Sequence, residues 1–207
     1  MLCSRVSSTG LNFLLLTHGA GSNRNAPLLV ALENAFHAAN IEVLRYDLSF
    51  RQERPHGPPR PGDAARDREG LREQILKIRD KKPERVWLGG HSYGGRQSSM
   101  LAAEAPGLVD ALLLLSYPLH PPRKPQELRT EHFPNLRTPA LFVHGVRDPF
   151  ATSGELTSAI ALIPVYVSLL EIEGAGHDLG RHHSDVSSRI VSAFLDHPGL
   201  SEKKLSV

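Results

Sequence analysis

Gly90-His91-Ser92-Tyr93-Gly94 follows the apolar run Val86-Trp87-Leu88, with one glycine between them. This G-x-S-x-G pattern lies where a strand is predicted to end and a helix to begin. Such a sharp turn holds the central serine in a strained backbone conformation, and the glycines two positions away on each side relieve the crowding. The serine hydroxyl is then exposed at the edge of a sheet, where the amino end of the helix favours developing negative charge. The pattern therefore indicates that Ser92 is a nucleophile.

Two partners for this serine follow predicted strands further along the chain, in the order acid and then histidine. Asp148 comes after the apolar run 140–142, and His177 comes after the run 165–170. Ligands bind at the carboxyl ends of the strands in open parallel sheets, so the three side chains are predicted to meet at one edge. We expect His177 to be the general base and Asp148 to orient it. Asp178 is a rival acid, but it neighbours the base in sequence and is expected to point elsewhere.

The alternative interpretation of Asp148 is a turn residue before Pro149, and that of His177 is a surface histidine in a glycine-rich turn. A further motif supports the catalytic interpretation. The apolar run 13–17 leads into His18-Gly19-Ala20-Gly21, where this kind of site places a loop that binds an oxyanion. The expected oxyanion donors are the backbone N–H groups of Tyr93 and Ala20.

Three stretches resemble a known family, namely 17–21 (THGAG), 88–96 (LGGHSYGGR) and 116–122 (SYPLHPP). The chain is similar to the α/β-hydrolases from about residue 11 to about residue 195. Within that superfamily it most resembles the small, capless dienelactone-hydrolase-like branch, which includes the group of testis-expressed protein thirty and the third subunit of the NSL chromatin complex. The resemblance implies a fold without a cap domain and cleavage of an ester, thioester or related acyl bond through an acyl-enzyme. The chromatin-complex relatives also leave open a non-catalytic binding or scaffold protein, and a peptidase is a third alternative.

Apolar runs that predict strands alternate along the chain with segments of helical spacing, which is typical of a parallel sheet. Most of these runs are continuously apolar, as in strands covered on both faces. The predicted fold class is therefore α/β, with a doubly wound, mostly parallel sheet of about six strands and helices on both faces. One domain is expected over residues 1–207. Thr152 and Glu155 are predicted to form a capping box. The predicted strands are 12–17, 42–46, 85–89, 110–116, 140–144 and 165–171.

The composition argues against several classes of function, namely nucleic-acid binding, a membrane span and a metal site. The net charge of +2 and the scattered Lys and Arg residues give no indication of nucleic-acid binding. No apolar run approaches the ~18 residues of a membrane span, and the single cysteine, Cys3, suits a reducing compartment, so a cytoplasmic protein is expected. The spacing of His177, His182 and His183 does not suit a metal site. No cofactor or metal is expected, and the partner is predicted to be a small-molecule acyl substrate.

Two irregular, proline-rich segments, 51–63 and 117–139, follow predicted strands at the catalytic edge. Either they are plain surface connections or they shape the site, and the second is too short for a lid domain. We expect an open, shallow cleft walled by Tyr117, Leu119 and His120 on one side and by the loop 19–25 on the other. The basic residues Arg96, Arg123 and Lys124 are either solvated or bind an anionic substrate.

Overall fold

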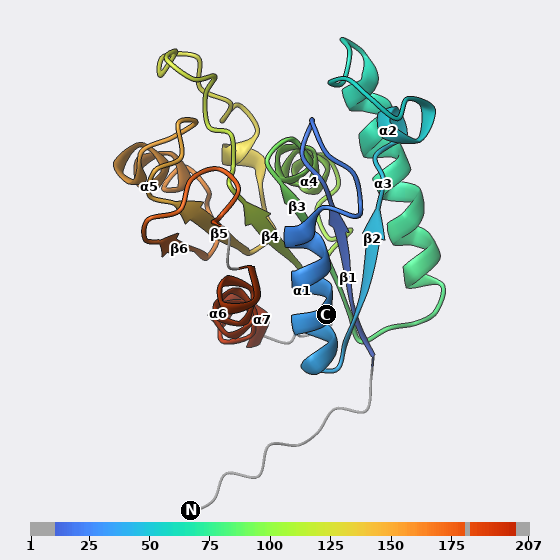
Figure 1. Ribbon diagram of the computed structural model, residues 1–207. Helices are drawn as coiled ribbons and strands as arrows, with labels where there is room; N and C mark the ends of the chain where they lie inside the picture. The colour runs from blue at the N-terminus through green and yellow to red at the C-terminus, as the bar shows by residue number, and fades with distance from the viewer. Residues whose placement is uncertain (1–10, 181–182, 202–207) are drawn as a thin grey trace, which may run out of the picture.

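One sheet of six parallel strands organises the molecule, in the order β2-β1-β3-β4-β5-β6 (Figure 1). The structure is a computed structural model that describes residues 11–180 and 183–201. Cys3 and His182 lie outside the described residues. The predicted fold class is confirmed, and all the strand pairs are parallel. The strands are β1 (Asn12–Thr17), β2 (Ile41–Tyr46), β3 (Arg85–His91), β4 (Ala111–Leu115), β5 (Ala140–Gly145) and β6 (Val167–Ile172).

Successive strand residues supply two separate hydrophobic cores, because side chains alternate between the faces of a sheet. In β1, Leu15 packs into one core, whereas Leu14 and Leu16 pack into the other. The four central strands are almost entirely buried, and the edge strands β2 and β6 keep many half-buried side chains. The continuous apolar runs of the central strands thus reflect burial on both faces.

Helices cover both faces of the sheet. On one face lie α1 (Pro27–Ala38) and α6 (His183–Leu195), which are side by side in front of the sheet in Figure 1. Phe194 joins them, since its ring packs edge-on at 5.9 Å from that of Phe36 and at 5.2 Å from that of Trp87. The other face is covered by α3 (Asp63–Arg79), α4 (Tyr93–Glu104) and α5 (Ser153–Ile160). The α5 helix begins at the predicted capping box.

In that capping box the Thr152 hydroxyl accepts a hydrogen bond from the Glu155 N–H at 3.2 Å, and the Glu155 carboxylate accepts one from the Thr152 N–H at 2.8 Å. The short α7 (Pro198–Ser201) begins where the sequence pattern predicted that the last helix would already have ended.

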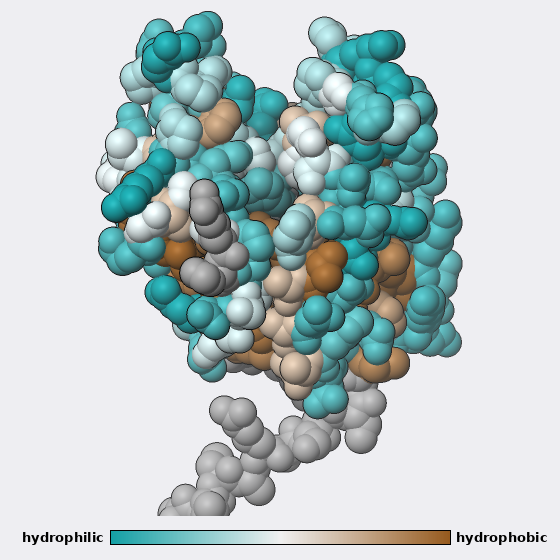
Figure 2. All heavy atoms as spheres, in the orientation of Figure 1, coloured by the Kyte–Doolittle hydropathy of each residue, from teal (hydrophilic) through white to brown (hydrophobic). Residues whose placement is uncertain are grey.

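The two irregular segments rise from the carboxyl edge of the sheet. The first begins within a short helix, α2 (Ser49–Glu53), that sequence patterns did not indicate. Burial of Phe50 and Arg51 stabilises this helix. The second contains only the 3-10 turn η1 (Phe133–Asn135), so no cap stands over the edge within the described ranges. Figure 2 shows a hollow between the two raised segments. Of the helices in residues 11–180 and 183–201, none is long and apolar enough to cross a membrane.

Candidate active site

Ser92 lies on the predicted sharp turn between β3 and α4. Its φ of 52° and ψ of −116° form a conformation that side chains rarely adopt, and its N–H donates to the Leu115 carbonyl at 2.8 Å. The flanking glycines are required by close packing. A Cβ at Gly90 would lie 2.4 Å from the Gly94 carbonyl carbon, and one at Gly94 would lie 2.5 Å from the His18 carbonyl oxygen. The motif therefore fixes the backbone that presents the serine.

The structure brings Ser92, His177 and Asp148 into one hydrogen-bonded chain. The His177 Nε2 atom lies 2.8 Å from Ser92 Oγ, and Nδ1 lies 2.7 Å from Asp148 Oδ2. The Asp148 side chain is fully buried, whereas that of His177 is 25% exposed. Because a carboxylate only accepts, Nδ1–H donates to Asp148 and Nε2 is left to accept the serine proton.

The loops that carry the acid and the base are packed directly against each other. A Cβ at Gly145, the last residue of β5, would lie 2.2 Å from the Gly176 carbonyl oxygen. Just beyond, the Arg147 N–H donates to the Ala175 carbonyl at 2.8 Å. The second oxygen of Asp148 accepts from the Phe150 N–H at 2.9 Å. These backbone contacts set the separation of Asp148 and His177.

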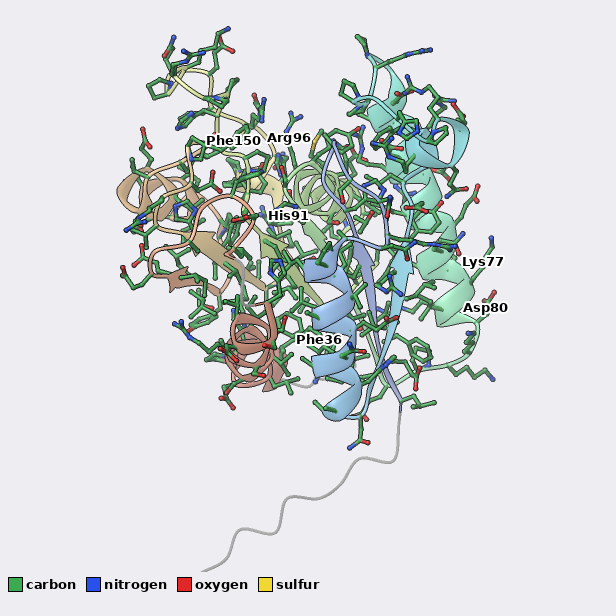
Figure 3. All side chains as sticks on the ribbon, viewed as in Figure 1. Phe36, Lys77, Asp80, His91, Arg96 and Phe150 are labelled. Atoms are coloured by element: carbon green, nitrogen blue, oxygen red, sulfur yellow. The ribbon has the colours of Figure 1, made fainter. Side chains whose placement is uncertain are left out.

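Two ring side chains that sequence reasoning did not assign to the site, His91 and Phe150, contact His177; both are labelled in Figure 3. The Phe150 ring lies 4.3 Å from the His177 ring, centroid to centroid. His91, the second residue of the G-x-S-x-G motif, donates from Nε2 to the His177 carbonyl at 2.7 Å. Burial lowers the pKa of His91 to about 4, so its ring is neutral at pH 7. The position of His91 inside the motif was a usable signal, whereas no pattern marks Phe150.

The loop expected to bind an oxyanion lies against the serine. A Cβ built on Gly19 would be 3.4 Å from the Ser92 Cβ.

Asp67 links Tyr93 to α2. The Tyr93 hydroxyl donates to Asp67 Oδ2 at 2.8 Å, and Asp67 Oδ1 accepts from the Phe50 N–H at 2.9 Å. Burial raises the pKa of Asp67. The donor roles of Tyr93 and Ala20 stay predictions.

Arg51 ties this loop to α2. Its side chain is buried and hydrogen-bonds carbonyl groups on both sides. It donates to the Ala20 carbonyl at 2.9 Å and to the Ser22 carbonyl at 2.8 Å, and further to the carbonyls of Gly57 at 3.0 Å and Arg54 at 3.2 Å. The composition of segment 51–63 gave no indication of this role, because the partners lie far apart in sequence.

Replacing Arg51 with methionine should therefore lower the free energy of unfolding by about 1–3 kcal/mol, since partly buried carbonyls lose a charged donor. Urea denaturation measures the effect as a lower midpoint with an unchanged slope. Arg123→Met is the matched control. Arg123 is exposed, so the change there should stay within about 0.5 kcal/mol. An Arg51→Met protein as stable as the wild type would contradict a structural role for these hydrogen bonds.

Tyr117, Leu119 and His120 do not occupy the cleft wall that the sequence predicted. Tyr117 and Leu119 have no exposed surface, and His120 is 5% exposed. The Tyr117 hydroxyl donates to the Arg129 carbonyl at 2.6 Å, and its ring packs on Phe133. These side chains turn inwards because packing against the core beside β4 and β5 removes their apolar surface from water.

A recess of about 180 Å³ lies between Gly19, the start of α1 and His91, with His183 also in its lining. Ser22, from the loop 19–25, lines it as well. Ser92 itself does not line the recess, which is therefore beside the serine rather than above it. No cluster of three or more metal-binding side chains occurs within residues 11–180 and 183–201.

Comparison with known proteins places this geometry in context. Residues 11–192 match a family model described as an alpha/beta hydrolase domain. Among solved structures, dienelactone hydrolase from Anabaena variabilis is 21% identical with a TM-score of 0.71, covering 92% of this chain and 88% of that one. An alpha-beta serine hydrolase homologue from Coxiella burnetii is 18% identical with a TM-score of 0.70, covering 87% and 83%. A serine hydrolase without a lid from Xanthomonas campestris is 15% identical with a TM-score of 0.68, covering 89% and 83%. At such identities these structures show a shared fold.

Proposed function

Because this chain belongs to the α/β-hydrolase family, we propose that it is a serine hydrolase that cleaves an ester, thioester or related acyl bond through an acyl-enzyme intermediate. The observation that carries the proposal is the continuous hydrogen-bonded chain from Ser92 Oγ through the His177 ring to the buried carboxylate of Asp148. A fold alone does not define an activity, but this arrangement of nucleophile, base and orienting acid suits acyl transfer.

In the proposed reaction His177 Nε2 takes the hydroxyl proton as Ser92 Oγ attacks the carbonyl carbon of the substrate. The resulting imidazolium is stabilised by Asp148 and gives its proton to the leaving group as the bond to that group breaks. Water then attacks the acyl-serine, again losing its proton to His177, and the acid is released with Ser92 restored. Backbone N–H groups of Tyr93 and Ala20 would bind the tetrahedral oxyanion, and such a donor contributes about 2.7–4 kcal/mol where its removal has been measured.

The open edge and the composition support a proposal for the substrate and the compartment. A small-molecule acyl substrate suits an edge over which the described residues form no cap, and the single cysteine in the sequence suits the reducing cytoplasm. A scaffold protein would not need the buried acid behind His177, because an isolated buried carboxylate is costly unless it is hydrogen-bonded or paired.

The open edge predicts a preference for short acyl groups. His177 is partly exposed and no cap covers it among residues 11–180 and 183–201, so a long alkyl tail cannot gain the ~0.8 kcal/mol per methylene that burial would give. With p-nitrophenyl esters from C2 to C12, kcat/KM should be highest at C2–C4 and should not rise beyond C4. Rates measured with Ser92→Ala protein provide the background. A steady rise from C2 to C12 would show that a deep apolar channel exists and would refute this prediction.

A further inference from the structure

The two oxyanion donors named above lie on separate segments of the chain. The Ala20 N–H belongs to the loop after β1, and the Tyr93 N–H belongs to the first turn of α4. Within residues 11–180 and 183–201, neither N–H donates to a backbone carbonyl. Both must point at one oxygen atom in order to stabilise it, so their relative position decides how much each contributes.

The short helix α2 contacts both of these segments. Figure 1 shows it at the upper end of α3. The buried Phe50 ring of α2 packs edge-on against the Tyr93 ring, with 5.8 Å between the centroids. It also lies 5.8 Å from the ring of His18, the residue that directly precedes the oxyanion loop. Phe50 therefore separates the side chain of one donor residue from the base of the loop that carries the other.

Hydrogen bonds from α2 and its start fix the loop around Ala20. The Leu48 N–H donates to His18 Nε2 at 3.1 Å, so the other ring nitrogen, Nδ1, donates to the Gly19 carbonyl at 2.8 Å. That carbonyl is in the same planar peptide group as the Ala20 N–H, so its hydrogen bond sets the direction of the N–H. Arg51 donates to the next carbonyl, that of Ala20, at 2.9 Å. Both peptide groups that flank Ala20 are thus held in place.

A buried carboxylate fixes the Tyr93 side in the same way. Asp67 has no exposed surface, and its two oxygens accept from the Tyr93 hydroxyl at 2.8 Å and from the Phe50 N–H at 2.9 Å. One side chain thus joins the residue after the nucleophile to the backbone of α2. Apolar groups of the same shape can replace a buried polar pair at little cost in stability, so stability alone gives little reason for a carboxylate here.

We propose that α2 sets the position of both oxyanion donors, and that Asp67 and Arg51 are the positioning residues through which it does so. This inference rests on the proposed serine hydrolase function and gives two residues outside the triad a role in its rate. Hydrogen bonds to an oxyanion weaken steeply with distance and angle, and a misplacement of about 1 Å can cost on the order of 10²-fold in rate. Acylation and deacylation both pass through a tetrahedral oxyanion, so a displaced donor should lower kcat and leave KM nearly unchanged.

Three substitutions test the two links. Tyr93→Phe removes only the hydroxyl that binds Asp67 and keeps the ring and the backbone N–H. Asp67→Ala breaks the same link from the other side, and Arg51→Met releases the loop at Ala20. With p-nitrophenyl acetate, we expect each folded variant to lower kcat at least about tenfold and to change KM less than about threefold.

An oxyanion analogue provides the second measurement. When Ser92 Oγ adds to the carbonyl carbon of 1,1,1-trifluorobutan-2-one, its proton passes to His177 and the former carbonyl oxygen becomes the bound oxyanion. The inhibition constant of this ketone should therefore rise about as much as kcat falls. A role in stability alone would not change the inhibition constant of the folded protein.

Ser49→Ala is the matched control. The Ser49 hydroxyl donates to the Arg66 carbonyl at 3.1 Å, so its removal also breaks a hydrogen bond between α2 and α3, but one that reaches neither oxyanion segment. Its kcat and its inhibition constant for the ketone should stay within about twofold of the wild type. Circular dichroism and urea midpoints establish that each protein is folded.

The proposal would be overturned if folded Tyr93→Phe or folded Arg51→Met kept kcat within twofold of the wild type. It would also be overturned if kcat fell while the inhibition constant of the ketone stayed unchanged, or if Ser49→Ala lost as much activity as these variants. Each of these results would leave the hydrolase proposal standing. A wild type that neither cleaves the ester nor binds the ketone, and whose Ser92 is unreactive, would refute both proposals.

Discussion

Replacing Ser92 with alanine should lower kcat/KM for p-nitrophenyl acetate at least ~10³-fold, because removing the nucleophile disables the whole catalytic unit. The Ser92 backbone conformation is set by the packing of Gly90 and Gly94, so the alanine protein should keep its fold. Initial rates of nitrophenol release, with the urea midpoint of each protein, measure the two effects separately.

Ser158→Ala provides the control for this measurement. The Ser158 hydroxyl donates to the Gly154 carbonyl on the exposed side of α5, away from the hydrogen-bonded chain of Ser92 and His177. Its removal should change the rate less than about twofold, in keeping with the small effects of surface substitutions. Equal turnover by wild-type and Ser92→Ala protein would mean that the activity comes from a contaminant or from another site.

Replacing Asp148 with asparagine should lower kcat by about 10³–10⁴-fold with little change in KM. The amide would present its NH₂ group or its carbonyl to His177 Nδ1, and only the carboxylate both fixes the tautomer and stabilises the imidazolium. The effect is expected to be large because the Asp148 side chain is fully buried and bonds His177 at 2.7 Å. Steady-state kinetics on a short-chain ester give kcat and KM separately.

Asp178→Asn is a stringent control, since Asp178 neighbours His177 in sequence and carries the same functional group as Asp148. Its carboxylate accepts a hydrogen bond from the Gly180 N–H at 3.1 Å, within its own turn. We expect a change of less than about threefold. Asp148→Asn activity within tenfold of the wild type, or an equal loss in Asp178→Asn, would show that the acid has been assigned to the wrong residue.

The sheet was predictable because its information is local. Each central strand is a short apolar run followed by a turn, and a parallel sheet places every such run in the same direction. The positions of Ser92, Asp148 and His177 followed from the same reasoning, since each comes directly after a predicted strand. The strained conformation at Ser92 was also predictable from the sequence, because the flanking glycines are needed there for close packing.

Contacts between distant segments were not predictable in this way. In the sequence, Arg51 is one basic residue in a proline-rich stretch. Only the structure shows that its side chain binds carbonyl groups near residue 20. Tyr117 follows a strand at the catalytic edge, as His177 does, yet its ring turns into the core between Phe133 and Phe142. Sequence position gives the edge on which a residue lies, whereas the direction of its side chain depends on which surfaces are left to be buried.

The central claim, that Ser92 is an activated nucleophile, is tested most directly by covalent labelling. The folded wild-type protein is incubated with a fluorophosphonate, and its intact mass and tryptic peptides are measured beside those of Ser92→Ala and Ser158→Ala. We predict one adduct per chain on Ser92 in the wild type and in Ser158→Ala, and none in Ser92→Ala. A folded wild-type chain that remains unlabelled would contradict the hydrolase proposal and favour a binding protein built on the same fold.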